Sequence, residues 1–305
     1  MLPVFQTLII GLAQGSSYAL IALGYTMVYG VLGMINFAHG EVFTLGAYAG
    51  ILALAGGTAL GLTTSHPLAA LAAAGAISVG VCAIHGMAIE RIAYRPLRKA
   101  HALAPLISAI GVSLFLQNYL QMTQGTDNKV FPHAVRGIFD GAPLLGGALS
   151  RVQAVILGAS LSCMSALHLF VTRTRAGRAM RAVSQDPAMA ALCGVDVDRT
   201  ISVTFALGSA LAAAGGVLVA LNYGSAHPYM GYQAGLKAFT AAVLGGIGSI
   251  PGAMLGGLLL GVLEAAGSSI QAVADYKDAL AFLVLLAVLL FRPSGLMGEK
   301  AVVKV

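Results

Sequence analysis

Three side chains that could handle protons or charge stand close together near the start of the chain. Asn36, His39 and Glu41 fall within MINFAHGE (34–41), and Glu41 is the first charged side chain of the sequence. Polar and ionisable groups in an apolar segment are costly unless they face a cavity or a partner. We therefore consider two compatible roles. The three residues line a pathway or gate at a break between helices, or they cap that break, with Glu41 favoured by the helix dipole.

A glycine-rich turn forms the second candidate site. The apolar segment 237–267 is about one and a half membrane spans long at about 1.5 Å per residue, and the charge pattern described below places both of its ends outside. It must enter the membrane and return, and GGIGSIPG (245–252) is the obvious turn. Backbone exposed at that depth is tolerated only against protein or a water-lined cavity. We expect four glycines to line the pathway or gate: Gly245, Gly246, Gly248 and Gly252.

Covalent chemistry is not indicated by the sequence. Cys82, Cys163 and Cys193 are isolated, and their spacing fits neither a metal site nor a redox pair. No glycine-rich phosphate loop of the Walker type is present, so this chain is not expected to bind ATP by that route. Carboxylates within the apolar segments are too few and too scattered for an evident proton relay. We expect a protein that is not an enzyme and that holds no cofactor or metal of its own.

Other polar residues in or beside the apolar segments have more ordinary expected roles. Lys237 is expected to extend its ammonium group to the outer interface, and Glu264 to serve packing or a helix end. Hydrogen bonds between helices are the expected role of four further residues: Gln14, Tyr18, Asn118 and Asn222.

The composition requires elements that cross a membrane. The 305 residues are 58% hydrophobic and only 9% charged, whereas a soluble domain carries about a quarter charged residues. Several windows exceed about 18 apolar residues, the length that spans a bilayer. We predict an all-α, polytopic protein with a single transmembrane domain (1–305) and broken helices. Roughly eight spans are expected: 5–32, 40–56, 67–90, 103–122, 151–172, 201–221, 237–267 and 277–292.

Basic residues mark one end of these spans. Of the 17 Lys and Arg residues, four lie between Arg91 and Lys99, five lie within 173–199, and three are Arg292, Lys300 and Lys304. Clusters beside apolar segments follow the positive-inside rule and give no reason to expect nucleic acid as a partner. Residues 123–150 then lie outside, and three segments are predicted to be cytoplasmic: 91–101, 173–199 and 293–305.

The segment 173–199 contains signals for a short helix outside the membrane. Five arginines and three aspartates stand there between long uncharged runs. Asp186 can cap the free N–H groups of a helix, and Pro187 suits its first position. Gly194 offers the stop. We predict a helix over 187–193.

The predicted helix needs a partner. Met189 and Leu192 are three residues apart, so they share one face. An apolar face held outside the bilayer must be buried against something, and Arg178 and Arg181 can add charge-assisted bonds to acidic groups on that partner. We therefore predict that 173–199 is a cytoplasmic coupling loop.

The two halves of the chain share a weak repeat. VLGMI (31–35) is similar to VLGGI (243–247), and Gly40 falls at the same offset as Gly252. The segment 5–56 also enters and returns if the N-terminus lies outside. Internal repeats that flank broken helices are typical of transporters, and the breaks point to the pathway.

Three motifs carry a family resemblance: INFAHGEVFTLGAY (35–48), KAFTAAVLGGIGSIPGAMLGG (237–257) and RPSGLMG (292–298). They resemble the branched-chain amino acid ABC transporter permeases of the LivH type, and the resemblance covers nearly the whole chain. It implies a multi-pass permease of the bacterial inner membrane that forms half of a translocation pathway for leucine, isoleucine and valine. The coupling segment of that family corresponds to the loop around Arg181 to Gly194.

The same resemblance implies partners. They are a second, LivM-like permease, two cytoplasmic ATPases that bind ATP, and a periplasmic amino-acid-binding protein, in addition to membrane lipid. Permeases for urea or short amides share much of this architecture and stay open as an alternative. A free-standing channel or secondary carrier is the alternative from another class, and it does not need the capped helix 187–193. An intramembrane enzyme is disfavoured because no nucleophile–base or metal set converges in the sequence.

Overall fold

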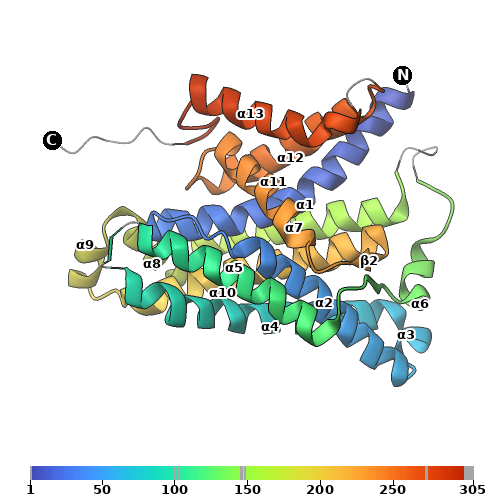
Figure 1. Ribbon diagram of the computed structural model, residues 1–305, viewed down its shortest axis with the longest axis horizontal. Helices are drawn as coiled ribbons and strands as arrows, with labels where there is room; N and C mark the ends of the chain where they lie inside the picture. The colour runs from blue at the N-terminus through green and yellow to red at the C-terminus, as the bar shows by residue number, and fades with distance from the viewer. Residues whose placement is uncertain are drawn as a thin grey trace.

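The protein is a bundle of long helices that run roughly along one axis (Figure 1). Seven helical segments are long and apolar enough to cross a membrane, which confirms the predicted all-α, polytopic fold. The computed structural model describes residues 2–98, 100–101, 103–144, 147, 149–271 and 274–298. Lys99, Lys300 and Lys304 of the predicted basic clusters lie outside the described residues.

The membrane-length helices are α1 (Leu2–Leu32), α2 (His39–Ala59), α4 (Pro67–Ile89), α5 (Leu103–Gln124), α7 (Arg151–Arg173), α10 (Val197–Tyr223) and α12 (Ile250–Ser268). A π-helical turn (Glu90–Tyr94) and a 3-10 turn (Arg95–Leu97) continue α4. Two shorter helices in the bundle are α11 (Met230–Gly245) and α13 (Lys277–Phe291). Short helices between them are α3 (Leu62–Ser65), α6 (His133–Arg136), α8 (Arg175–Gln185) and α9 (Pro187–Leu192).

The segment predicted as 237–267 differs most from its expected boundaries. It consists of two helices, α11 and α12, which confirms that the chain turns back at the glycine-rich stretch. However, α11 begins at Met230, within the expected outer loop 222–236. The glycines that make this region resemble a loop are needed for packing, because a Cβ on Gly231 would lie 2.2 Å from the carbonyl oxygen of Gly40 on α2.

The last predicted span is shorter than expected. Helix α13 has 15 residues, about 23 Å at 1.5 Å per residue. A helix that crosses the hydrocarbon core needs about 20 residues. Of the eight predicted spans, α13 is therefore the one that falls short of membrane length.

The two helix–turn–helix units pack reciprocally, which supports the predicted repeat. The first unit is α1 and α2, and the second is α11 and α12. Helix α1 packs along α12, and α11 packs on α2, so the first helix of each unit contacts the second helix of the other. Both units break at related positions, with positive φ at Gly33 in the first turn and at Gly246 in the second.

Small residues allow α1 and α12 to approach closely. A Cβ on Gly15 would lie 2.7 Å from the carbonyl oxygen of Gly257, and one on Gly261 would lie 2.3 Å from the Gly15 backbone. On its other side, α12 places Gly256 against Ala241 of α11, with 2.1 Å between that Cβ and the carbonyl oxygen. Small residues on α12 therefore serve two different helix interfaces, Gly257 and Gly261 the one with α1, and Gly256 the one with α11.

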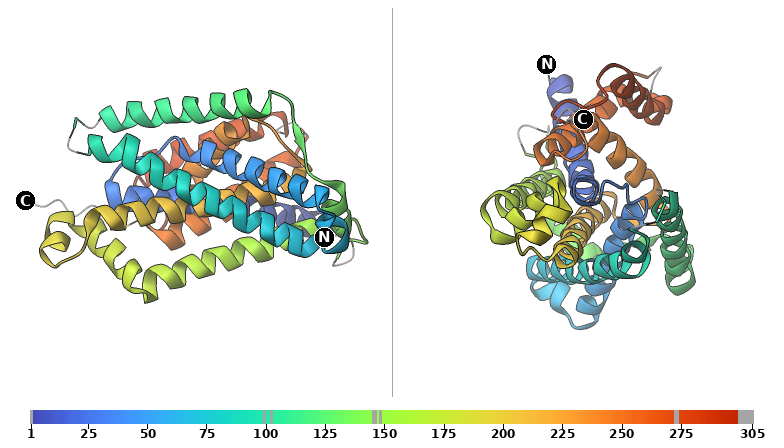
Figure 2. Two further views of the ribbon diagram at one scale, coloured as in Figure 1. Left: turned by 90° about the horizontal axis from the view of Figure 1, so that it is seen from below. Right: turned by 90° about the vertical axis from the view of Figure 1, so that its left-hand side faces the viewer.

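The two ends of the bundle are built differently (Figure 2). At one end α8 and α9 lie beside the connection from α4 to α5, so the first two basic clusters share that end. At the other end the strands β1 (Lys129–Val130) and β2 (Ser225–Ala226) pair antiparallel, and Phe131 and Val135, which belong to the segment 123–150, are buried. By the charge rule the first end is expected to be the cytoplasmic one.

Candidate coupling surface and outer cavity

Helix α9 has the ends that its sequence predicts. The Asp186 carboxylate accepts hydrogen bonds from the backbone N–H groups of Ala188 and Met189 at 2.9 and 3.0 Å. Pro187 occupies the first turn, and Gly194 takes a φ of +82° just after the helix. The predicted helix over 187–193 is confirmed to within one residue.

The apolar face of α9 is uncovered in the described part of the chain. Met189 is 60% exposed and Leu192 is 82% exposed, whereas Ala190 on the opposite face is 5% exposed. The helix is thus anchored by one face and presents the other away from the bundle. This geometry fits a docking surface for a second protein.

Helix α8 was missed by the sequence analysis. Its buried face contains Gly177, Met180 and Val183, and Thr174 caps it by accepting a hydrogen bond from the Gly177 N–H group. Spacings of three residues are typical of one helical face, so these three residues could have shown the helix. The helix fixes the position of α9 relative to α1, α7 and α10.

The two arginines predicted to meet a partner occupy the outer face of α8. Arg178 is exposed. The Arg181 guanidinium donates a hydrogen bond to the carbonyl oxygen of Val171 near the end of α7, and the rest of its side chain remains exposed. A contact of either arginine with an acidic partner stays a prediction.

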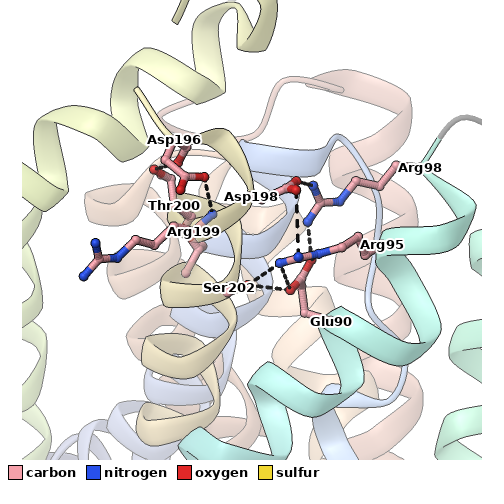
Figure 3. A network of polar contacts seen from close by, with 9 residues as sticks. Glu90, Arg95, Arg98, Asp196, Asp198, Arg199, Thr200 and Ser202 are labelled. Carbon is pink, nitrogen blue, oxygen red and sulfur yellow. Dashed lines mark hydrogen bonds and ion pairs between the residues drawn. The ribbon is translucent and has the colours of Figure 1, made fainter. Parts of the chain in front are cut away.

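A buried carboxylate joins the base of this surface to α4 (Figure 3). The Glu90 side chain is fully buried and accepts hydrogen bonds from Arg95, Arg98 and the hydroxyl group of Ser202, the last at 2.6 Å. Arg98 also contacts Asp198 at 2.6 Å, and Arg95 donates to Ser202 at 2.9 Å. We call these five residues the inner cluster.

The inner cluster connects segments that are far apart in the sequence. Glu90, Arg95 and Arg98 follow α4, whereas Asp198 and Ser202 belong to the first turns of α10, directly after α9. In contrast, the Arg199 side chain points away from the cluster in Figure 3. The roles of Glu90, Asp198 and Ser202 were not predicted from the sequence. The one signal for such a cluster is an acidic residue at the end of a predicted span that is followed by arginines.

The first helix break places its polar residues inside the protein. Asn36 accepts hydrogen bonds from the Ala38 N–H group at 3.0 Å and from the Tyr94 hydroxyl group at 2.8 Å. His39 packs against Tyr25, with 5.0 Å between ring centroids, and Glu41 lies in the first turn of α2. Asn36 thus closes a turn before α2 but does not cap that helix, which begins without a side-chain cap hydrogen bond, so the predicted capping role of Asn36 is wrong. No residue of the trio Asn36, His39 and Glu41 lines the cavities described below.

His39 shows how deep this break lies. Its imidazole occupies the space next to Gly24, where a Cβ would come within 2.1 Å of Nε2. Gly24 is about two helical turns before the end of α1. After α1 ends, the chain therefore runs back into the bundle before α2 starts at His39.

The second helix break is enclosed by the C-terminal segment. The backbone N–H groups of Leu296 and Met297 donate to the carbonyl oxygens of Leu244 and Gly245, both at 2.9 Å. Gly246 has a φ of +109° and leaves room for Gly298, whose nitrogen would lie 2.4 Å from a Cβ. Two of the family motifs therefore pack on each other.

The four predicted gate glycines differ in surroundings. Gly245 and Gly252 face each other, with 1.9 Å between a Cβ on Gly245 and the Gly252 carbonyl oxygen. Gly246 contacts the C-terminal segment. Gly248 has open space beside it and borders a hollow of about 70 Å³ that also involves Thr26 and Arg181. Among the four, only Gly248 borders a described cavity.

A cavity of about 490 Å³ opens at the other end of the bundle. It is lined by residues of α1, α2, α7, α10, α11 and α12 and by the first two residues of α13. Lys237 and Glu264 line it and form an ion pair at 2.5 Å. The expectation that Lys237 extends to the outer interface is therefore wrong, because a buried carboxylate holds its ammonium group.

One hydrogen bond beside this cavity joins two helices. Tyr18 of α1 donates to Glu264 of α12 at 2.8 Å, which confirms the interhelical role expected for Tyr18. The same expectation is wrong for Gln14 and Asn118, because Gln14 donates to Tyr18 and Asn118 to the Leu114 carbonyl oxygen, each within its own helix.

Comparison with known proteins shows the family. The family described as "Branched-chain amino acid transport system / permease component" matches residues 7–289. The chain belongs to this permease family. Its helix breaks, its C-terminal RPSGLMG segment and its capped helix α9 are thus features of a transport permease.

Relatives match this permease along their full length. It is 50% identical to the "High-affinity branched-chain amino acid transport system permease protein BraD" of Pseudomonas aeruginosa, over 98% of this chain and 97% of the relative. It is 47% identical to the LivH protein of the same description from Salmonella typhimurium, with the same coverage. The Escherichia coli LivH protein is 46% identical, again over 98% and 97%. The family assignment that the sequence motifs indicated is therefore confirmed.

Proposed function

We propose that this permease is the membrane subunit of an ATP-binding cassette importer that carries branched-chain amino acids across the bacterial inner membrane. Relatives named for that transport share 46–50% identity with it over nearly their whole length. It acts as a transporter and not as an enzyme. Its partners are a LivM-like permease, two cytoplasmic ATPases that bind the ATP, and a periplasmic amino-acid-binding protein.

The observation that carries the coupling part of this proposal is the exposed face of α9. Met189 and Leu192 are 60% and 82% exposed on a helix whose ends are fixed by Asp186 and Gly194. Burying two such side chains is worth a few kcal/mol, at about 1.5–3 kcal/mol each. Such a contact is strong enough to hold an ATPase and weak enough that one substitution disrupts it.

The structure provides a route from α9 into the membrane. Helix α9 continues into α10 through Gly194, and the inner cluster attaches the first turns of α10 to the end of α4. Helix α8 packs on α1, α7 and α10. A movement of α9 imposed by an ATPase is therefore applied to several spans together. We propose that this movement drives alternation between outward-facing and inward-facing states.

The test is the substitution Met189→Asp. We expect the permease to fold and reach the membrane, while leucine uptake and substrate-stimulated ATPase activity in proteoliposomes with all subunits fall at least tenfold, since about 1.4 kcal/mol of lost contact energy corresponds to tenfold. The matched control is Met189→Leu, which keeps an apolar side chain of similar size at the same position. Unchanged uptake and full ATPase stimulation in Met189→Asp would show that α9 is not the coupling element.

We further propose that the second helix break acts as an inner gate. Gly248, with a φ of +95°, borders the small hollow beside Arg181. Gly248→Leu should impair uptake while the complex still assembles. Gly61→Leu is the matched control, because Gly61 has a φ of +72° and open space but lies beyond the outer end of α2. Equal uptake in the two variants would contradict a gate at Gly248.

A further inference from the structure

The outer cavity combines a charged side and an apolar side. At about 490 Å³ it lies within the range of about 300–1,000 Å³ that is typical of small-molecule sites. Lys277 and Asp278, both exposed, stand at its mouth on α13. Ile21 of α1 and Phe43 of α2 lie at its inner end. Both are almost fully buried, with 1% and 0% of their surface exposed.

The charged side is an ion-pair chain across three helices. The Lys237 ammonium group contacts Glu264 at 2.5 Å and Asp278 at 2.8 Å. The Glu264 side chain is only 2% exposed, and its second oxygen accepts the hydrogen bond from Tyr18. We call Tyr18, Lys237, Glu264 and Asp278 the outer cluster. Burying a carboxylate this deeply would be costly without partners such as these.

The charges that line the cavity balance. Lys237 and Lys277 oppose Glu264 and Asp278, so the lining is neutral when His227 is uncharged. A free anion or cation would leave an uncompensated charge in this setting, which is costly. A zwitterion adds one charge of each sign and preserves the balance. The lining thus favours a ligand that carries both an ammonium and a carboxylate group.

The apolar side defines the rest of the ligand. Behind the ion pairs, Ile21, Phe43, Ile156 and Met230 line the cavity. These side chains offer no hydrogen bonds, so they favour an aliphatic or aromatic ligand portion, although uncharged polar side chains such as Gln153, Asn222 and Gln233 also line the cavity. An α-amino acid with a branched alkyl side chain has both required parts at the required ends.

We propose that the outer cavity is a substrate-binding site within this permease and that the outer cluster recognises the amino-acid head group. The ligand carboxylate binds Lys237, its ammonium group binds between Glu264 and Asp278, and its alkyl chain points toward Ile21 and Phe43. This inference rests on the proposed function and adds a discrete station to the pathway.

Exchange of ion pairs makes such binding reversible. Lys237 holds two carboxylates, and Asp278 is 53% exposed, so the contact with Asp278 is the easily broken one. The entering carboxylate replaces Asp278 on Lys237, and the entering ammonium group binds the Asp278 carboxylate that this frees. No buried charge loses its partner during the exchange. The Lys ammonium group suits this role because it is a point charge with three rotatable donors.

Photo-cross-linking of the assembled transporter tests the site directly. The probe is leucine with a diazirine in its side chain, added with binding protein to proteoliposomes that contain the whole complex. We expect adducts on the peptides that carry Ile21, Phe43 or Met230, located by mass spectrometry. Excess leucine should remove them. Leucinol, which lacks the carboxylate, and 4-methylpentanoate, which lacks the ammonium group, should not.

A cavity-filling variant provides the second arm. Ala234 lines the cavity, and Ala234→Phe should lower both cross-linking and uptake at least tenfold. Ala166→Phe on α7 is the matched control, because Ala166 is exposed on the outside of the bundle. Adducts only on other segments, or undiminished uptake in Ala234→Phe, would overturn the proposed site. Failure of the wild-type complex to take up leucine would instead overturn the proposed function itself.

Discussion

The inner and outer clusters use the same arrangement of charges in different surroundings. In each, a buried carboxylate binds a cationic side chain that also contacts a second, largely exposed aspartate. The Glu90 side chain is fully buried and Asp198 behind it is 57% exposed. The Glu264 side chain is 2% exposed and Asp278 behind it is 53% exposed. The two ends of the bundle can therefore be compared residue by residue.

The difference lies in the cation and in the space around it. The inner cluster uses arginines, whose planar forks fix the geometry of each bond, and Ser202 closes the network between Glu90 and Arg95. The outer cluster uses one lysine beside a cavity of about 490 Å³. A similar set of charges therefore forms a fixed network in the inner cluster, where every partner is held in place. In the outer cluster, which borders a cavity, we expect the partners to exchange.

The largest expected effect is the loss of Glu90, the carboxylate at the centre of the inner cluster. Glu90→Ala leaves Arg95 and Arg98 without their shared carboxylate, and breaking a buried ion pair costs about 3–5 kcal/mol. The free energy of unfolding of the purified permease in detergent should fall by that amount. Asp198→Ala, which removes a mainly exposed partner, is the control. A loss of unfolding free energy below about 1 kcal/mol in Glu90→Ala would contradict the view that the inner cluster is a fixed, stabilising network.

The next largest effect is expected when Arg98 is replaced by lysine, which lacks the planar guanidinium group. Arg98 bonds Glu90 through one nitrogen and Asp198 through another. Arg98→Lys keeps the charge but loses the fork that holds the buried Glu90 carboxylate, so the unfolding free energy should fall by about 1.5–3 kcal/mol, the worth of one charge-assisted hydrogen bond. Most of this loss is expected at Glu90, and less than about 1 kcal/mol at the exposed Asp198. Combining it with Asp198→Ala should add little, because both changes remove the same contact. Full additivity would refute the shared contact.

The hydroxyl group of Ser202 should contribute less. It donates to Glu90 at 2.6 Å and accepts from Arg95 at 2.9 Å. Ser202→Ala should lower the unfolding free energy by about 1–2 kcal/mol, since a typical bond contributes about 1 kcal/mol. Ser162→Ala is the matched control, because that exposed serine bonds only the Gly158 carbonyl oxygen of its own helix. Equal losses of unfolding free energy in the two variants would show that Ser202 does not stabilise the inner cluster.

The converse substitution, from lysine to arginine, tests the outer cluster. Lys237→Arg should change the unfolding free energy by less than about 1 kcal/mol, because the fork can bind both carboxylates. Uptake should nevertheless fall by about tenfold, the equivalent of about 1.4 kcal/mol, because a fork held by Glu264 and Asp278 exchanges partners poorly. Normal uptake in this variant would show that partner exchange at Lys237 is not part of transport.

The smallest effects are expected at the two exposed aspartates. Asp198→Asn and Asp278→Asn should each lower the unfolding free energy by less than about 1 kcal/mol, as for other exposed ion pairs. Both effects should shrink in 1 M salt, where the Debye length is about 3 Å. Thermal unfolding at low and high salt measures this. A large loss of unfolding free energy that does not depend on salt would show that the aspartate concerned acts as a buried, essential partner in its cluster.

Local signals in the sequence were sufficient for part of the coupling surface. Asp186, Pro187 and Gly194 define α9 through contacts that reach no further than four residues along the chain. The helix breaks were also predictable, since glycines and isolated polar residues interrupt apolar runs. Helix α8 and the start of α11 were missed. In both, glycines such as Gly177 and Gly231 weaken the local helix signal but allow close contact with another backbone.

The clusters themselves could not be predicted in the same way. Ser202 is 112 residues from Glu90, and Glu264 is 246 residues from Tyr18. Each charge is isolated in its own segment, where a packing or interfacial role is the ordinary interpretation. Only the adjacency of α4 with α10, and of α1 with α11 and α12, brings the partners within bonding distance.

The sequence by itself determined that this protein crosses the membrane with helices, where those helices break, how α9 is capped and to which family the chain belongs. These properties depend on apolar length, on backbone hydrogen bonds that cannot be left unpaired in lipid, and on contacts within a helical turn. Tertiary structure alone decided which charges meet and whether a cavity lies beside them. Ion pairing depends steeply on the distance between side chains and on the water left around them, and both are set by how the helices pack.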